Sequence, residues 1–112
     1  MLRLAKTTPD ELAIPTIVVY ELEYGTLRSK LPARRRSDLQ EGLKNIRHVP
    51  FDSDAAMAAA RIRVELGKRG ATIGPLDILI AGTAFSRGAI LGTNNASEFS
   101  RVPGLRVADW RS

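Results

Sequence analysis

Short apolar segments alternate with longer segments of helical character along this chain. The apolar residues Leu12–Pro15 predict a strand, and Pro15 ends that strand or places it at a sheet margin. A helix is expected to follow from Ile17 to about Ser29, with Thr16 as its N-cap. The start of the chain therefore predicts a strand that leads directly into a helix.

The same alternation continues to the other end of the chain. Proline at a first helical turn, a polar cap or a closing glycine marks most of the boundaries. The expected elements are helices over about 32–45, 54–68 and 76–87, and short strands over 48–51, 89–92 and 105–107. This order predicts an α/β sandwich around a mostly parallel sheet, in which binding sites form at the carboxyl ends of the strands.

Composition limits the chain to one basic domain. Its 112 residues suit a single domain over 1–112, and 17 basic against 12 acidic residues give a net charge of +5. That surplus favours nucleic acid or an acidic protein as partner, although a basic domain with neither role has the same composition. The absence of cysteine excludes disulfides and thiolate metal sites. With neither a membrane span nor an apolar leader segment recognisable, the expected location is the cytoplasm.

Asp77 is the most informative residue for chemistry. It lies in the first turn of an expected helix whose next nine residues, 78–86, carry no charge. A helix that is apolar on every side is buried, so a carboxylate at its mouth must be paired, hydrogen-bonded or bound to a cation. The alternative interpretation is an ordinary first-turn aspartate favoured by the helix dipole.

Two glutamates in the helix that starts near Ile17 are further candidates. Glu21 and Glu23 are separated by about 200° around a helix, so they cannot share a face. Both faces are fairly apolar, and geometry does not choose between them.

A polar turn follows the strand expected at 89–92. Thr93, Asn94 and Asn95, with Glu98 close behind, could orient a metal-bound water or a phosphate, although such residues are also routine in turns. Acidic residues that converge at the carboxyl ends of parallel strands would suit Mg²⁺ or Mn²⁺, which prefer oxygen ligands. His48 is the only histidine, so a zinc site is not expected.

Together these segments resemble the VapC branch of the PIN-domain nucleases. The matching stretches cover the chain nearly end to end, and their combination is more specific than any one of them. They are residues 14–25 (IPTIVVYELEYG), 74–81 (GPLDILIA), 88–99 (GAILGTNNASEF) and 102–110 (VPGLRVADW).

The resemblance implies a PIN-like three-layer sandwich and a metal-dependent endoribonuclease. Such an enzyme would use Mg²⁺ (or Mn²⁺), act as the toxin of a type II toxin–antitoxin pair, be held inactive by a cognate antitoxin, and form a homodimer. It implies Glu21 and Asp77 as catalytic and metal-binding residues, Asn94 and Asn95 as catalytic-site residues, and Glu98 as the nearest acid for a further metal position.

The start of the chain departs from the family pattern. Members open with a central strand that ends in an Asp-Thr-Asn motif, followed by a helical pair, and no residue in 1–15 matches the aspartate, Asp10 included. Loss of that strand would leave two strand edges open in the sheet. Either the gene start is assigned too late or the chain is a remnant.

The departure keeps two alternatives to the enzyme open. The first is a catalytically inactive PIN-domain remnant that binds antitoxin or RNA without cleaving. The second is an unrelated basic nucleic-acid-binding domain, which would bind without any dependence on divalent metal.

Overall fold

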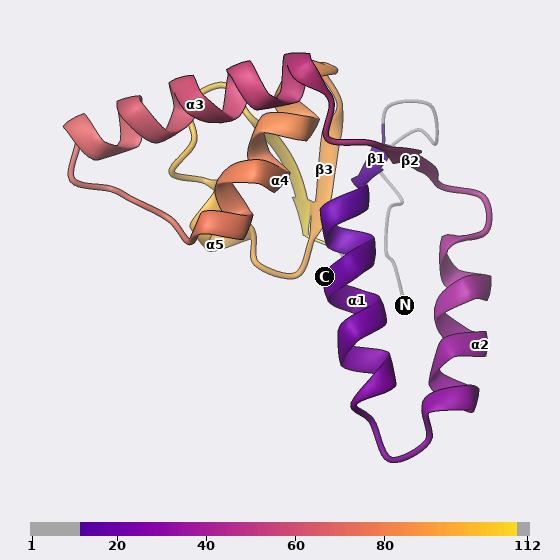
Figure 1. Cartoon of the computed structure of the whole chain (residues 1–112). Helices are drawn as coiled ribbons and strands as arrows, with labels where there is room; N and C mark the ends of the chain where they lie inside the picture. The colour runs from indigo at the N-terminus through magenta and orange to yellow at the C-terminus, as the bar shows by residue number, and fades with distance from the viewer. Residues whose placement is uncertain (1–11, 110–112) are drawn as a thin grey trace.

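The computed structural model describes residues 12–109 as a parallel sheet with helices (Figure 1). Expectations for Asp10, for the polar turn over 1–11 and for Trp110 lie outside these residues. The elements in chain order are β1 (Leu12–Pro15), α1 (Thr16–Leu27), α2 (Pro32–Leu43), β2 (Arg47–Val49), α3 (Ser53–Lys68), α4 (Pro75–Ser86), β3 (Ile90–Thr93), α5 (Ala96–Phe99) and β4 (Arg106–Asp109). The predicted alternation of strands and helices is therefore confirmed.

The sheet has the strand order β2-β1-β3-β4, and all three pairings are parallel. β3 and β4 pair over four residues, from Ile90 opposite Arg106 to Thr93 opposite Asp109. β1 is buried along its whole length, as expected for a strand inside a parallel sheet. The predicted α/β fold with a parallel sheet is confirmed.

β1 and β3 pair directly with each other. Leu12 lies opposite Ile90, and Ala13 opposite Leu91. The expectation of two open strand edges is therefore wrong for residues 12–109, because the edges that a missing strand would leave open satisfy each other's backbone groups. This pairing is short, with two residue pairs against four between β3 and β4.

α4 is buried between α3 and the sheet (Figure 1). Its residues Ile80, Ala81 and Ala84 have at most 2% of their surface exposed, as the uncharged run predicted. Gly82 faces α3 so closely that a Cβ atom there would lie 2.6 Å from the Cβ of Ala59 and 2.8 Å from the backbone oxygen of Ala55. The absence of a side chain at Gly82 therefore sets how near the two helices approach.

The start of α1 corrects one prediction. Thr16 is the first residue of α1 and not its N-cap: Pro15 holds that position, and no side chain caps the helix, because the proline ring has no acceptor. Asp52, by contrast, caps α3 by accepting a hydrogen bond from the backbone N–H of Ala55 at 2.9 Å. Asp52 also pairs with Arg87 at 2.7 Å, which joins the start of α3 to the end of α4. The four-residue helix α5 was not predicted.

α1 and α2 form a helical hairpin that projects from the sheet (Figure 1). α2 packs against α1, and none of its residues is buried. Arg36 of α2 pairs with Glu23 of α1 across the hairpin at 3.4 Å. We call residues 16–43 the arm. None of the helices described is both long and apolar enough to cross a membrane.

Gly82→Ala should destabilise the fold. Alanine is the better helix former by about 1 kcal/mol, but the added methyl meets the backbone of α3. We expect the free energy of unfolding to fall by about 1–3 kcal/mol, measured by urea denaturation. Gly67→Ala, in α3 with open space around its Cβ position, is the control and should match or slightly exceed the original stability. Equal effects at the two sites would contradict the close-packing account.

Candidate functional site

One pocket brings together the four candidate catalytic residues. Glu21, Asp77, Asn94 and Asn95 all line a hollow of about 340 Å³. The rest of its wall consists of Val18, Leu22, Ile80, Thr93 and Phe99. The polar groups thus stand on a mostly apolar floor, which is typical of ligand-binding sites.

Three different elements position these side chains. Glu21 is in the second turn of α1, which follows β1, and Asp77 is in the first turn of α4. Asn94 and Asn95 directly follow β3. The backbone N–H of Asn95 donates to the Thr93 hydroxyl oxygen at 2.9 Å, which closes the turn. The expected gathering of polar residues at the carboxyl ends of parallel strands is therefore present.

Asp77 holds its proton far more tightly than an ordinary aspartate. Burial, together with a hydrogen bond to Glu98 and the negative charges of Glu98 and Glu21, raises the pKa of Asp77 from 3.8 to about 7. The pKa of Glu98 is lowered in turn, chiefly by its hydrogen bond with Asp77. Asp77 therefore donates the hydrogen bond, and Glu98 accepts it as the ionised partner.

Glu98 supports the pocket without being part of its lining. Its carboxylate accepts a hydrogen bond from the amide nitrogen of Asn95 at 2.8 Å and another from Asp77. Within residues 12–109, no three His, Cys, Asp or Glu side chains come together as a metal-binding group. Asp77 nevertheless interacts with both Glu98 and Glu21, and the metal set of Glu21, Asp77 and Glu98 stays a prediction.

The two glutamates of α1 point to different sides. Glu21 lines the pocket with Asp77, whereas Glu23 faces α2, where it pairs with Arg36 and borders a separate hollow beside Lys44 and His48. Sequence reasoning could not choose between them, because α1 has apolar residues on both faces and the position of α2 decides which face is covered. His48 is exposed on β2 and does not line the candidate pocket.

The donor set of the pocket fits a hard divalent cation. The pocket is lined by two carboxylates, two side-chain amides and a threonine hydroxyl. The atoms of these groups that can coordinate a cation are all oxygens. Mg²⁺ commonly binds through one or two carboxylates and keeps several waters or substrate phosphates. Burial raises the pKa of Asp77 most, and the negative charges of Glu98 and Glu21 raise it further; a cation at this position would offset that part of the effect.

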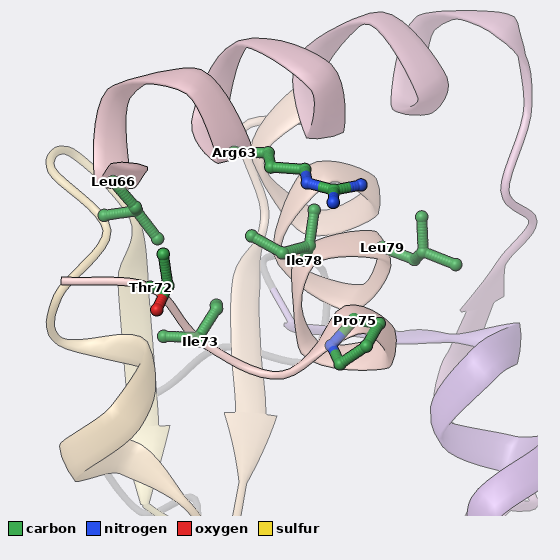
Figure 2. A pocket seen from close by; sticks show the side chains of 7 residues that line it. All are labelled: Arg63, Leu66, Thr72, Ile73, Pro75, Ile78 and Leu79. Atoms are coloured by element: carbon green, nitrogen blue, oxygen red, sulfur yellow. The ribbon is translucent and has the colours of Figure 1, made fainter. Parts of the chain in front are cut away.

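A second pocket was not foreseen from the sequence. It has a volume of about 310 Å³ and lies between the end of α3, the following loop and the start of α4 (Figure 2). Its lining is Arg63, Leu66, Thr72, Ile73, Pro75, Ile78 and Leu79. It contains no carboxylate, so it does not compete as a site for a hard cation.

Comparison with known proteins identifies the family. The model of the PIN domain matches residues 2–105. The chain belongs to the PIN domain family. The PIN domain is 38% identical over 101 residues to the tRNA(fMet)-specific endonuclease VapC of Salmonella typhimurium, covering 90% of this chain and 76% of that protein. It is 36% identical over 101 residues to Ribonuclease VapC2 of Rickettsia felis, covering 90% and 75%.

Solved structures agree with this assignment. The PIN domain is similar to DNA-bound VapBC from Salmonella typhimurium, with a TM-score of 0.79 and 39% identity over 88% of this chain and 74% of that chain. It is also similar to VapBC2 from Rickettsia felis bound to a promoter DNA fragment, with a TM-score of 0.81 and 36% identity over 96% and 79%.

The raised pKa of Asp77 should make stability fall with pH. Between pH 3.8 and about 7 the folded chain keeps a proton that the unfolded chain releases, so unfolding is favoured as pH rises through this window. In Asp77→Asn the side-chain amide does not titrate, so this pH dependence is absent. We expect the advantage of this variant in free energy of unfolding over the original chain to grow from pH 5 to pH 8, measured by urea denaturation in EDTA. A constant difference would contradict the raised pKa.

Proposed function

We propose that this PIN domain is a metal-dependent endoribonuclease, the toxin component of a type II toxin–antitoxin pair. The observation that carries the proposal is the convergence of Glu21, Asp77, Asn94 and Asn95 in one pocket. The names of the relatives, VapC endonuclease and ribonuclease, support the same reaction class.

Each side chain has a role that its position allows. Glu21 and Asp77 would hold Mg²⁺ or Mn²⁺. Glu98, which is hydrogen-bonded to Asp77, would orient the Asp77 carboxyl group. The cation, when bound, would activate water and neutralise charge that grows on a phosphodiester. The amides of Asn94 and Asn95 would orient the phosphate, and Asn95 is itself held by Glu98. Asp77 must release its proton to bind the cation, so metal binding and activity should increase with pH.

The partners follow from the same proposal. The substrate would be RNA, and the neighbours solved as VapBC complexes support an antitoxin protein as the inhibitor. We further propose that residues 1–112 act as a single domain, that the chain forms a homodimer, and that it works in the cytoplasm.

Removing either pocket carboxylate should abolish cleavage. Glu21→Gln and Asp77→Asn each take away an anionic ligand, and the loss of several kcal/mol of metal-assisted stabilisation corresponds to at least about a hundredfold drop in rate. The assay uses the purified chain, a mixed single-stranded RNA, and Mg²⁺ or Mn²⁺, with EDTA as the metal-free arm.

Glu23→Gln is the matched control, because Glu23 lies on the same helix but outside the pocket. It should keep its rate within about threefold, since it removes no pocket contact. Cleavage that survives in Asp77→Asn and in EDTA would overturn the proposal. RNA binding by the original chain with no cleavage in any metal would instead identify a binding protein that does not cleave.

A further inference from the structure

The positive charge of the chain is concentrated at one place. Residues 27–36 contain five basic residues and no acidic one, which equals the net charge of +5 for the whole chain. The rest of the sequence therefore has as many acidic as basic residues. These ten residues cover the end of α1, the connecting turn and the start of α2. We call this segment the arm tip.

The arm tip lies at the end of the hairpin that is far from the sheet (Figure 1). Its basic residues are Arg28, Lys30, Arg34, Arg35 and Arg36, and all are exposed. Arg34 and Arg35 border a shallow hollow of about 260 Å³ together with Leu31 and Asp38. Among the described residues only Arg36 of this group forms an ion pair, with Glu23. Most of this charge is therefore available to an anionic partner.

One row of side chains connects the pocket with the arm tip. Glu21 and Tyr24 of α1 and the C-cap residue Arg28 are spaced three and four residues apart, so they follow one another along one face of the helix. Seven residues of helix span about 10 Å. The guanidinium of Arg28 lies over the ring of Tyr24, 5.3 Å from its centroid. The row thus leads from a carboxylate of the pocket, past an aromatic ring, to the basic segment.

Tyr24 presents an exposed aromatic ring on α1. Its exposed fraction is 54%, although a tyrosine of this size is usually better covered in a folded domain. An exposed ring flanked by guanidinium groups is typical of surfaces on which unpaired nucleic-acid bases stack. Bases inside a duplex cannot stack in this way, so the arrangement favours a single-stranded segment.

We propose that the arm is the RNA-binding element of this PIN domain: a base of single-stranded RNA stacks on Tyr24, and the adjacent phosphates lie against Arg28, Lys30, Arg34 and Arg35. This assignment rests on the proposed endoribonuclease function and names the surface that delivers the strand to the pocket at Glu21. Charge complementarity supports RNA, because each nucleotide supplies one phosphate to a segment that has five positive charges and no negative one.

The electrostatic part is tested with Arg34→Ala/Arg35→Ala. The matched control is Arg61→Ala/Arg63→Ala, which removes the same two charges from exposed positions of α3. Binding of a labelled, unstructured RNA of twelve nucleotides is measured by fluorescence anisotropy in EDTA, so that cleavage does not enter. The arm variant should raise Kd about tenfold or more. The negative slope of the logarithm of the association constant against the logarithm of salt concentration should become less steep by about 1.4, which corresponds to two lost phosphate contacts. The control should change Kd less than about twofold.

The stacking part is tested with Tyr24→Leu and Tyr24→Phe. Leucine keeps apolar bulk and loses the ring, so RNA binding should weaken by about tenfold while the salt slope stays unchanged. Phenylalanine keeps the ring and should bind within about twofold of the original chain. This pattern separates a stacking contact from a general loss of surface.

The outcomes distinguish this inference from the proposed function. If RNA cleavage depends on Asp77 but the arm and Tyr24 variants bind RNA as tightly as the control, the inference is wrong and the function stands. If the same variants leave RNA binding unchanged and abolish self-association in sedimentation measurements, the arm is a protein interface and the inference is wrong. Weakened binding with the expected salt slopes supports the inference whether or not the chain cleaves.

Discussion

The burial of α4 is the constraint on which the rest of the structure depends. α4 lies between α3 and the strands β1 and β3, and at Gly82 it touches the backbone of α3 with no side chain between them. A helix enclosed in this way cannot turn or slide without opening a cavity or a clash. Its first turn is therefore held in place, and Asp77 is fixed at the mouth of the pocket by packing at Gly82, about one and a half turns further along the helix.

The chemistry of the pocket follows from that fixed position. Asp77 is partly removed from water, is hydrogen-bonded to Glu98 and lies near the negative charge of Glu21. Its pKa is therefore raised, and it keeps a proton at pH values where an exposed aspartate is ionised. Such a site is poised between binding a proton and binding a cation. Asn95, held by Glu98 and by the turn after β3, places an amide at the same point.

Sequence reasoning was most successful where a local pattern decides the structure. The uncharged run after Asp77 predicted the buried helix, and the polar residues after the apolar strand at 89–92 predicted the turn that borders the pocket. The family resemblance selected Glu21, which helical geometry alone could not do. The pocket lining agrees with that choice, whereas the roles of its residues remain predictions.

What could not be predicted depends on contacts between distant segments. The direct pairing of β1 with β3 joins residues almost 80 positions apart, and no local signal specifies it. The exclusion of Glu98 from the pocket lining depends on where α5 packs, and α5 itself is too short to produce a periodic pattern. The apolar pocket between α3 and α4 also arises from how two helices meet, which neither sequence segment reveals alone.

The pocket is assembled from two units of the chain that meet along the short β1–β3 pairing. One contains β1, the arm and β2, and the other runs from α3 to β4. They are joined by the two β1–β3 residue pairs, by contacts of α4 with β1 and α1, and by a shared hydrophobic core. Glu21 belongs to the first unit, while Asp77, Asn94 and Asn95 belong to the second. The pocket therefore exists only while both units are packed on their shared core, so a change that loosens this core also separates Glu21 from Asp77.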